Sequence, residues 1–537
     1  MSDDNLENVE SRTYYSILLH DVSNKIKSTL AQDSRTTMDE VNLALKECGF
    51  GRFHIRLLFA SFLGHTAGVV VSSTTPYILP VAECDLNMGL LEKGILNAMP
   101  YVGMIASCLV AGFLTDTFGR KKFLLIGFGG LFIFSITSAL SQTYNILVTS
   151  KFFEGFLFAM SFSPLLTLSS ELYHPGIRDR IMLVQSSFVA IGQVVLAFIT
   201  WGILTFDWTD SYFNGMFVLH TWNYYLLIVS SWSLFATIFY AFIPESPKYL
   251  VTRHKYEEAR SVLIQLYTEN TGRTAETFKY ANLWKDKTKQ DFQIEENNMS
   301  MREKLSAGLE NIKPIFQKPL LLFLVFFCSI NFFTMQQYNV LRLWFPQLST
   351  IVENYRHDGS EDFCYMLDEY TTDLRDRVTN TTAACVPVRS GTETYLNSVI
   401  LGCICVLPNI VTSLLVNKMG KKNLLIICGL ISTGCTVGLR WAVSKTALVS
   451  LFSTDVSAAR AMISLTQAMV LEYFPTSCRS LAMSFIMMSG RTGTLFGNVM
   501  FPILLNIGCV VPLFSLAALL FGITSLALFL PAKNNDK

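Results

Sequence analysis

The sequence contains about twelve apolar runs, each close to the ~20 residues that a helix needs to cross the hydrocarbon core of a bilayer. These runs are too long for the strands of a membrane barrel, and backbone groups inside a bilayer must be hydrogen-bonded within their own segment, so the runs predict helices. We expect them near residues 56–82, 94–115, 123–141, 146–171, 181–203, 221–243, 320–348, 394–417, 423–441, 446–471, 480–503 and 508–530. Only 15% of the residues are charged, against roughly 25% in soluble domains. The sequence therefore predicts an all-α, multi-pass membrane protein.

The distribution of lysine and arginine predicts which side of the membrane each connection faces. Basic residues occur in alternate connections, at 116–122, 174–180, 417–422 and 475–480. The short connections at 142–145, 204–220 and 504–507 contain none. By the positive-inside rule, the basic connections and both termini face the cytoplasm.

Two long polar segments interrupt the apolar runs. Residues 244–319 carry charges of both signs and show helical spacing, so we expect amphipathic helices lying on the cytoplasmic membrane surface. Residues 349–393 fall on the external side and are strongly acidic. The predicted organisation is a cytoplasmic segment 1–55, an N-terminal six-helix bundle 56–243, a cytoplasmic linker 244–319, a C-terminal six-helix bundle 320–531 with the external loop 349–393, and a cytoplasmic tail 532–537.

The external loop contains two cysteines and one glycosylation motif. Cys364 and Cys385 are candidates for a disulfide, and Asn380 begins an Asn-Thr-Thr sequence that would accept a glycan. An oxidising exterior permits both modifications. The alternative is a pair of free thiols and an unused motif.

The two halves of the chain repeat each other. The stretch LTDTFGRKKFLL in the first half resembles LVNKMGKKNLLI in the second, which aligns Gly119 with Gly420 (420 − 119 = 301). The same offset aligns Glu171 with Glu472 (472 − 171 = 301). Two motifs in the same order at one offset indicate a duplicated six-helix unit, which is the parallel type of repeat found in transporters.

These motifs resemble those of the major facilitator superfamily. The turn GFLTDTFGRKK at 112–122 is similar to its signature Gly-x-x-x-Asp-x-x-Gly-Arg-Lys-Lys, and PESPKYL at 244–250 is similar to the motif that follows the sixth helix of sugar porters and organic ion transporters. The stretch FTMQQYNVLRLWFP at 333–346, with the insert after it, resembles the synaptic vesicle glycoprotein 2 and SVOP-like branch, although the insert is much shorter here. The resemblance implies twelve transmembrane helices in two pseudo-symmetric six-helix bundles that rock about a central site.

The resemblance also implies that the cytoplasmic turns hold the two halves together in one state and release them in the other. The gating candidates are Gly112, Asp116, Gly119, Arg120, Glu171 and Arg178 in the first half and Asn417, Gly420, Lys421, Glu472 and Arg479 in the second. Asp116 suits this role because a carboxylate beside a helix N-terminus or an arginine gains a charge-assisted contact that rocking can break. Asn417 lacks that charge, so we expect a stronger lock in the first half. The alternative is that the basic residues only set the orientation of the chain.

Ionisable side chains inside the apolar runs are costly, and each therefore marks a candidate functional site. The candidates for substrate binding are His65, Glu154, Gln336, Gln337, Tyr338, Asn339, Arg342, Asn409, Asp455 and Arg460, and Lys151, Gln193, Asn223 and Arg491 are further candidates for the same cavity. Glu154 and Asp455 share the repeat offset (455 − 154 = 301), so two equivalent acids could bind a cation or relay a proton. Each candidate has an ordinary alternative, because Lys151 could neutralise Glu154 one turn away, Arg342 could extend to the lipid headgroups, and His65 could be a packed, hydrogen-bonded histidine.

The sequence favours a secondary transporter of a small organic solute, with organic cations and organic anions both open. The alternative is a transporter-shaped vesicle protein with a regulatory or trafficking role that moves no solute. An enzyme is disfavoured because the chain has no phosphate-binding loop, nucleophile elbow or metal cluster, and we expect no cofactor, metal or nucleic acid. We expect a monomer in the plasma membrane or a vesicle membrane whose partners are the bilayer, the solute and a coupling ion that the sequence neither requires nor excludes.

Overall fold

Two compact units make up the computed structural model, which describes residues 37–212, 214, 217–284, 316–318, 320–355, 362–379, 390–405, 407–474 and 479–529. The small unit comprises Met1–Arg56, Ser170–Asp179 and Glu245–Gln293, and the large unit comprises Leu57–Ser169, Arg180–Pro244 and Ile294–Lys537. The domain boundaries expected from the sequence stay predictions.

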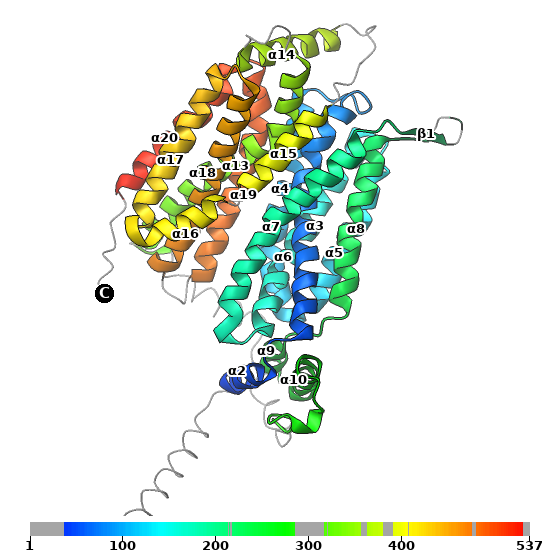
Figure 1. The fold of residues 1–537 in the computed structure, drawn as a ribbon, viewed down its shortest axis with the longest axis vertical. Helices are drawn as coiled ribbons and strands as arrows, with labels where there is room; N and C mark the ends of the chain where they lie inside the picture. The colour runs from blue at the N-terminus through cyan, green and yellow to red at the C-terminus, as the bar shows by residue number, and fades with distance from the viewer. Residues whose placement is uncertain are drawn as a thin grey trace, which may run out of the picture. The chain divides into compact units, whose positions relative to one another are not determined.

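Every apolar run expected to cross the membrane is helical in the described part of the chain (Figure 1). The first six are α3 (Arg52–Ala82), α4 (Leu90–Phe118), α5 (Arg120–Ala139), α6 (Tyr144–Leu172), α7 (Pro175–Leu204) and α8 (Thr221–Ala241). The second six are α13 (Leu320–Asn354), α15 (Thr392–Ile404) with α16 (Leu407–Met419), α17 (Lys421–Gly438), α18 (Lys445–Tyr473), α19 (Arg479–Leu505) and α20 (Val510–Leu526). Eight of the described helices are long and apolar enough to cross a membrane. Large apolar side chains such as Ile133, Phe198 and Leu322 stay exposed on them, as expected for surfaces that contact lipid.

The span expected at 394–417 consists of two helices rather than one. The first, α15, ends at Ile404 with Cys405 as its C-cap, and α16 begins at Leu407. Pro408 follows in the first turn of α16. Proline has no N–H and fits best in the first turn of a helix, which favours starting a new helix over continuing the old one.

The small unit contains the helices that the sequence predicted for the linker. These are α9 (Pro247–Thr252), α10 (Tyr256–Thr271) and the short η2 (Ala275–Thr277), joined by α2 (Thr37–Cys48) from the start of the chain. That the linker helices lie under the membrane stays a prediction, and the structure shows what covers the apolar face of α10. Its apolar residues Val262, Leu263 and Leu266 are buried, and α10 packs against α2 and α9. Protein side chains, rather than lipid, therefore cover that face.

A single asparagine joins the segments of the small unit. The Asn270 amide nitrogen donates to the carbonyl oxygens of Cys48 (3.2 Å) and Gly49 (3.3 Å), and its Oδ1 accepts from the backbone N–H of Phe53 (3.1 Å). A Cβ at Gly51 would lie 2.7 Å from the Asn270 Cα, so only glycine permits this approach. Because it satisfies backbone groups at the turn between α2 and α3, Asn270 holds α10 to both.

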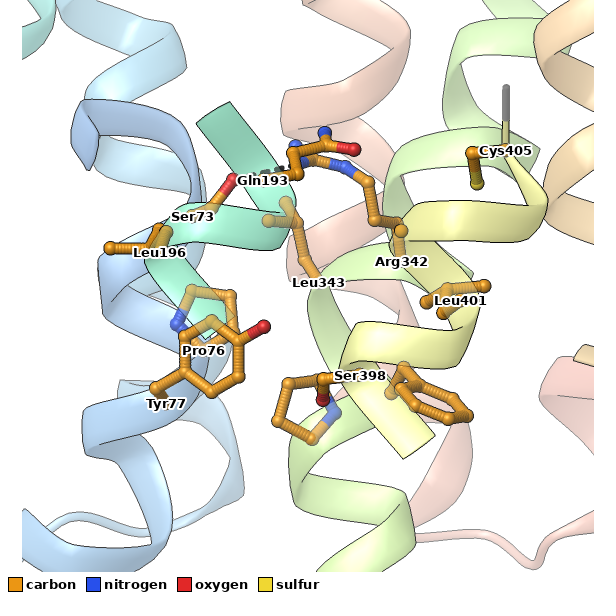
Figure 2. A pocket seen from close by; sticks show the side chains of 13 residues that line it. Ser73, Pro76, Tyr77, Gln193, Leu196, Arg342, Leu343, Ser398, Leu401 and Cys405 are labelled. Carbon is orange, nitrogen blue, oxygen red and sulfur yellow. Dashed lines mark hydrogen bonds between the residues drawn. The ribbon is translucent and has the colours of Figure 1, made fainter. Parts of the chain in front are cut away.

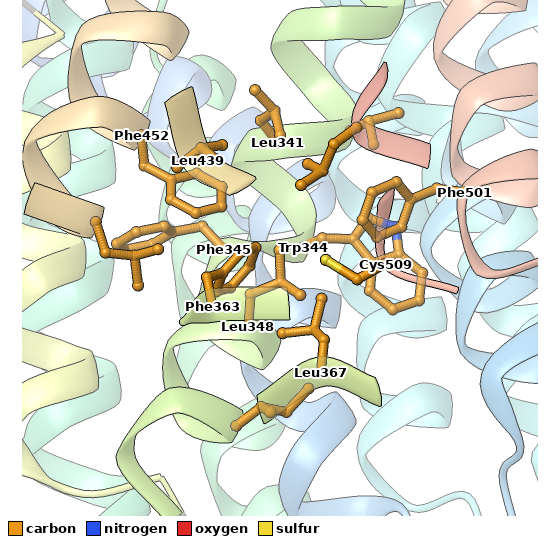
Figure 3. Packing of buried hydrophobic residues seen from close by; sticks show 14 of the residues in the cluster. Leu341, Trp344, Phe345, Leu348, Phe363, Leu367, Leu439, Phe452, Phe501 and Cys509 are labelled. Atoms are coloured by element: carbon orange, nitrogen blue, oxygen red, sulfur yellow. The ribbon is translucent and has the colours of Figure 1, made fainter. Parts of the chain in front are cut away.

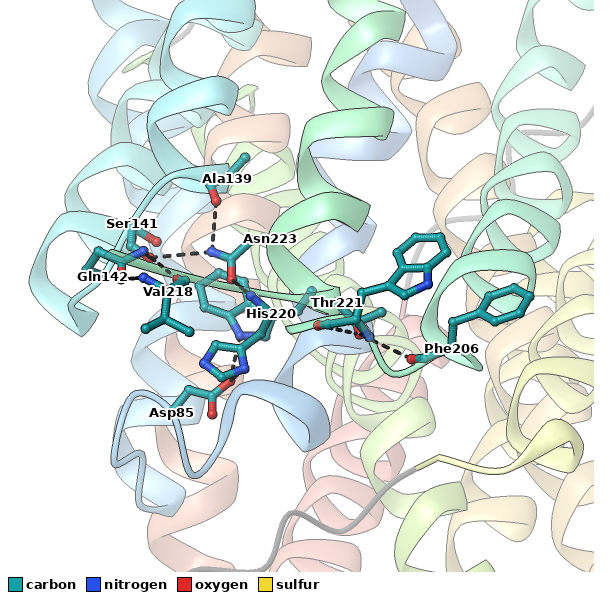
Figure 4. Close-up of polar contacts among 11 residues, drawn as sticks. Asp85, Ala139, Ser141, Gln142, Phe206, Val218, His220, Thr221 and Asn223 are labelled. Carbon is teal, nitrogen blue, oxygen red and sulfur yellow. Dashed lines mark hydrogen bonds and ion pairs between the residues drawn. The ribbon is translucent and has the colours of Figure 1, made fainter. Parts of the chain in front are cut away.

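A β-hairpin that the sequence did not predict occupies part of the connection 204–220. Strands β1 (Thr209–Tyr212) and β2 (Phe217–His220) pair antiparallel. The Gln142 side chain accepts from the Val218 N–H (3.0 Å) and donates to the Val218 carbonyl (2.9 Å), as Figure 4 shows. Asn223 then donates to the carbonyl of Ala139 (2.8 Å). These contacts attach the hairpin to the end of α5 and the start of α8.

The insert between α13 and α15 is also helical where it is described. Helix α14 (Phe363–Thr379) joins the hydrophobic core of the second half, where the rings of Phe345 and Phe363 both pack on Phe452 (Figure 3). The Arg440 guanidinium and the Asp362 carboxylate, 2.5 Å apart, anchor the start of the helix. The ion pair with Arg440 and the N–H of Tyr365 hold the pKa of Asp362 below its usual value, although desolvation by burial acts in the opposite direction as the largest influence. The insert is therefore a packed element.

The expected disulfide between Cys364 and Cys385 is wrong. Cys364, on α14, is bonded to Cys509 at the start of α20, with their Cα atoms 5.2 Å apart. The reason is that α14 packs against the second-half core, which brings Cys364 next to a residue far away in the sequence. Cys385 and Asn380 lie outside the described residues, so the glycan stays a prediction.

Glycine lets helices α4 and α6 come into backbone contact. A Cβ at Gly103 would lie 2.0 Å from the carbonyl oxygen of Phe152, and a Cβ at Gly155 would lie 1.9 Å from that of Pro100. Side chains cannot move aside here because the obstacle is backbone. Small residues of this kind allow the close van der Waals packing that holds membrane helices together.

Gly155→Ala is expected to lower stability by about 1–3 kcal/mol, because the added methyl forces α4 and α6 apart. Gly434→Ala on α17 is the matched control, since a Cβ there meets nothing within 4 Å and alanine is the better helix former. Thermal unfolding of the two purified variants measures the difference. Equal melting temperatures would contradict the close contact.

Candidate functional site

A central cavity lies between helices of the two halves of the large unit. Its walls come from α3 and α7 in the first half and from α13 and α15 in the second, and it encloses a volume of about 40 Å³ (Figure 2). The polar lining consists of Ser73, Tyr77, Gln193, Arg342, Ser398 and Cys405. The apolar lining is Pro76, Leu196, Leu343, Phe345, Pro346 and Leu401. A site shared by two halves is what alternating exposure of a solute requires.

Arg342 connects the two halves across this cavity. Its Nη1 donates to the hydroxyl of Ser73 on α3 (2.7 Å), and its Nη2 donates to the hydroxyl of Tyr101 on α4 (3.2 Å) and to Oδ1 of Asn339 on its own helix (3.2 Å). The Nε atom is buried and has no hydrogen-bond partner among the described residues. The alternative that Arg342 extends to the lipid headgroups therefore does not match its contacts. It is a cavity residue with unused hydrogen-bonding capacity.

A second arginine lies on the same tyrosine as Arg342. The guanidinium carbons of Arg342 and Arg460 lie 5.5 and 5.7 Å from the centre of the Tyr338 ring. Both distances suit a cation–π interaction. Within the described ranges, no carboxylate oxygen lies within 4.0 Å of either guanidinium. Two guanidinium groups without a carboxylate partner among the described residues therefore share the Tyr338 ring.

The other candidates on α13 have different environments. Asn339 donates to Thr494 on α19 (2.9 Å) and is linked to Arg342, so it positions the cavity arginine. Gln337 points to the opposite side, where its amide donates to Thr436 (2.6 Å). The Gln336 side chain packs beside Gly497 on α19. Of the four candidates Gln336, Gln337, Tyr338 and Asn339, the structure brings Tyr338 and Asn339 to Arg342.

The two repeat-related acids are buried away from the cavity wall. Glu154 accepts from Ser138 (2.5 Å) and forms an ion pair with Lys151 (2.9 Å), as the ordinary alternative predicted. Asp455 accepts from the hydroxyl groups of Ser432 and Thr436 and from the amide of Gln337. No basic side chain in the described residues lies within 4.0 Å of Asp455. The two positions are thus not chemically equivalent, because only the first has its own cation.

The remaining candidates lie outside the cavity lining. His65 is buried on α3, its Nδ1 lies 2.8 Å from the Ser61 carbonyl oxygen, and its ring contacts Phe162 and Phe188 edge-on. Arg491 on α19 donates to the carbonyl of Met104 on α4 (3.4 Å). Asn223 belongs to the hairpin attachment. The side chain of Asn409 lies outside the described residues.

The cavity contains polar residues that the sequence analysis missed. Ser73, Tyr77 and Ser398 line it, together with the predicted Gln193 and Arg342. Serine and tyrosine occur in ordinary membrane helices, where a hydroxyl can donate to a carbonyl of the preceding turn. The residue type alone therefore carried no signal, and only the arrangement of α3, α13 and α15 around the cavity identifies these residues.

A buried cluster of charged and polar groups, here called the outer cluster, joins the halves near α14. It consists of Glu83, Lys93, Gln347 and Tyr370. Lys93 forms an ion pair with Glu83 (2.6 Å) and donates to the Tyr370 hydroxyl (2.8 Å), which also accepts from Gln347 (3.2 Å). The side chains of Lys93 and Glu83 are 0% and 3% exposed. Sequence analysis missed this cluster because the expected span began at residue 94, which placed Lys93 outside it.

The outer cluster lies close to the cavity along α13. Gln347 comes five residues after Arg342 on that helix, which corresponds to about 7.5 Å of helix rise. Glu83 and Lys93 belong to the first half, whereas Gln347 and Tyr370 belong to the second. The cluster therefore joins the halves close to the cavity.

The repeated glycine turns are structurally equivalent. Gly119 precedes α5 with φ of 103°, and Gly420 precedes α17 with φ of 77°. Such positive φ values favour glycine. The structure does not describe the side chains of Asp116, Asn417 and Arg479. Of Gly112 it gives only the position in α4. Their gating roles stay predictions.

The charged gating candidates are found in two places. In the large unit, Lys421 forms an ion pair with Glu472. This pair joins the start of α17 to the end of α18 in the second half. In the small unit, the charges of Glu171 and Arg178 both influence the pKa of Lys248. Burial and the positive charge of Arg178 lower the pKa of Lys248, and Glu171 partly offsets this. Arg120 opens α5, and its Nε is buried.

Comparison with known proteins places the fold. Residues 62–339 match the family described as "Sugar (and other) transporter", and residues 388–537 match "Major Facilitator Superfamily". Synaptic vesicle glycoprotein 2A of Rattus norvegicus is 27% identical over 239 residues, which are 44% of this chain and 32% of that protein. Synaptic vesicle glycoprotein 2C of Mus musculus is 25% identical over 247 residues, 46% of this chain and 34% of that protein. The chain therefore spans about a third of the length of these relatives.

Solved transporter structures share the architecture. The inward-open xylose transporter XylE from E. coli superposes with a TM-score of 0.63 at 15% identity, covering 90% of this chain and 98% of that one. The nucleoside transporter NupG has a TM-score of 0.56 at 12% identity, covering 89% of this chain and 98% of that one. At such low identity these likenesses establish the fold alone.

Lys93→Met is expected to destabilise the protein by about 3–5 kcal/mol, because it leaves the Glu83 carboxylate buried without its cation. The double variant Lys93→Met/Glu83→Gln should recover part of this loss, since no unpaired charge remains. Lys255→Met is the control, because Lys255 and Glu258 form an exposed pair of the kind that contributes little. Chemical or thermal unfolding gives the values. A double variant less stable than the single one would contradict the assignment.

Proposed function

Because this chain belongs to the sugar (and other) transporter family of the major facilitator superfamily, we propose that it moves a small organic solute across a membrane by alternating access. The central cavity is the binding site in this proposal. The protein is a multi-pass integral membrane protein. We propose that its termini face the cytoplasm and that it resides in the plasma membrane or a vesicle membrane.

The observation that carries the proposal is the position of Arg342. This one side chain comes from the second half and donates to Ser73 and Tyr101 of the first, at the wall of the cavity. A solute bound to Arg342 would replace some of these contacts and so change the attraction between the halves. Coupling of solute binding to the relative position of two rigid bodies is the basis of alternating access.

The outer cluster supplies one gate in this scheme. The Tyr370 hydroxyl of the second half contacts Lys93 and Glu83 of the first, so the halves cannot separate on that side without breaking these hydrogen bonds and exposing the ion pair. We assign this side to the exterior, following the basic connections on the other. The second gate is the set of cytoplasmic turns, in which Asp116, Arg120, Glu171 and Arg178 stay the proposed lock.

Asp455 is our candidate for binding a coupling proton. It is fully buried and its partners are hydroxyl and amide donors. Glu154, in contrast, has Lys151 as a counter-ion. An intramembrane carboxyl with no cation beside it is a functional site by default. A solved relative in fold is a D-xylose–proton symporter, which agrees with a proton as the coupling ion.

Uptake into proteoliposomes tests the transport proposal. The full chain is reconstituted and offered labelled sugars, nucleosides, organic cations and organic anions. We expect wild type to accumulate at least one of them, and Arg342→Ala to lower the initial rate about tenfold or more at equal protein abundance, since charged hydrogen bonds contribute ~1.5–3 kcal/mol. Arg260→Ala is the control, because Arg260 pairs with the exposed Glu257 in the small unit. Failure of wild type to take up any solute would favour the regulatory or trafficking alternative.

An imposed proton gradient tests the role of Asp455. With an inward gradient, wild-type uptake is expected to rise several-fold, and Asp455→Asn is expected to lose that response because the isosteric amide cannot bind the proton. Glu154→Gln is the comparison variant; it leaves Lys151 buried without its partner, so lower stability rather than loss of the gradient response is expected. The assignment would be refuted if the wild-type uptake rate did not change with the proton gradient. It would also be refuted if the uptake rate of Asp455→Asn rose with the gradient as in wild type.

A further inference from the structure

We propose that the central cavity selects an organic anion, with an acidic head group such as a carboxylate or sulfonate and an apolar body. This inference rests on the proposed transport function and narrows it to one class of solute. It is carried by a guanidinium that has no acidic partner among the described residues, in a lining that holds no acid and six apolar side chains.

The polar end of the cavity offers donors and no acid. In Figure 2, the side chains of Arg342, Gln193 and Ser73 meet at one end of the cavity. Arg342 uses its two terminal nitrogens on neutral oxygens, and its Nε remains unpaired in the described part of the chain. Guanidinium groups bind carboxylates through two parallel hydrogen bonds. A negatively charged head group would supply the counter-charge that this end lacks.

This lack of a counter-charge distinguishes Arg342 from the buried lysines of the large unit. Lys93 has Glu83 at 2.6 Å, and Lys151 has Glu154 at 2.9 Å. Burying an ion without a partner costs several kcal/mol, so such pairing is the expected arrangement. Arg342 departs from it at the wall of the cavity, which is where a transported ion could complete the pair.

Arg460 strengthens the positive potential at the same place. It lies on Tyr338, as Arg342 does, and the described residues hold no carboxylate within 4.0 Å of it. Asp455 lies on the same helix as Arg460, but its carboxylate accepts hydrogen bonds from Ser432, Thr436 and Gln337. In a medium of low dielectric constant, two cations repel a cationic solute and attract an anionic one. The geometry thus selects the anion from the two classes of organic ion that the sequence left open.

The rest of the cavity lining is mostly apolar. It includes Pro76, Leu196, Leu343, Phe345, Pro346 and Leu401. The hydroxyls of Tyr77 and Ser398 are the polar groups away from Arg342 (Figure 2). Burial of apolar area against these side chains would contribute roughly 25 cal/mol per Å². A solute with an apolar body and one acidic group matches this lining.

Matched pairs of acids and amides test the charge requirement. The purified full chain in lipid nanodiscs is heated with benzoate or benzamide, phenylacetate or phenylacetamide, and benzenesulfonate or benzenesulfonamide, with benzylamine as the cation. A ligand that binds only the folded state raises the melting temperature. We expect the acids to raise it and the amides and benzylamine to do so much less, with acid binding at least about tenfold tighter, as for hydrogen bonds to a charged group.

Two variants locate the effect. Arg342→Gln should abolish the difference between acid and amide, and Arg342→Lys should retain part of it, because the charge remains without the planar fork. Arg260→Gln in the small unit should behave as wild type. Equal shifts for acids and amides, an acid preference that survives Arg342→Gln, or no shift with any probe would overturn the inference. The transport proposal has a separate readout, since uptake of a neutral solute without any preference for acids would leave transport intact and refute only the anion.

Discussion

The absence of water from the bilayer core is the constraint on which the rest of this structure depends. Every backbone group must be paired inside its own helix, and every charge must find a partner within the protein. The chain meets the first demand with long helices that expose apolar side chains. It meets the second with buried pairs such as Lys93 with Glu83 and Lys151 with Glu154. Against this background, a half-buried arginine without an acidic partner in the described residues is informative.

That exception lies where the halves meet. Arg342 is held by hydroxyl and amide oxygens from both halves, which are weaker partners than a carboxylate. Weak partners can be exchanged for a bound solute at little cost, whereas a buried ion pair resists exchange. The same reasoning explains why the strong contacts lie elsewhere. The Lys93–Glu83 pair stays within the first half, and only its hydrogen bonds to Tyr370 of the second half would break when the halves rock.

The insert between α13 and α15 links the gate to the second half. Helix α14 brings Tyr370 to Lys93, and its own position depends on the Cys364–Cys509 disulfide and on the Asp362–Arg440 ion pair. The glycine contacts between α4 and α6 make those two helices of the first half a closely packed pair in a similar way. Stiff packing within each half lets a local change at the cavity become a movement of one half against the other.

The sequence by itself determined the apolar runs that form the long helices and their order, because the length and polarity of a membrane-spanning run follow directly from the thickness of the bilayer. It also determined the repeat, which the equivalent positive-φ turns at Gly119 and Gly420 reproduce, and it identified Arg342 and Gln193 as cavity candidates. Tertiary structure alone decided which polar residues face one another. The partner of Cys364, the outer cluster around Lys93, the covered face of α10 and the cavity role of Ser73 all depend on contacts between residues far apart in the chain. Local composition carries no information about such contacts, because helix rotation and packing choose them.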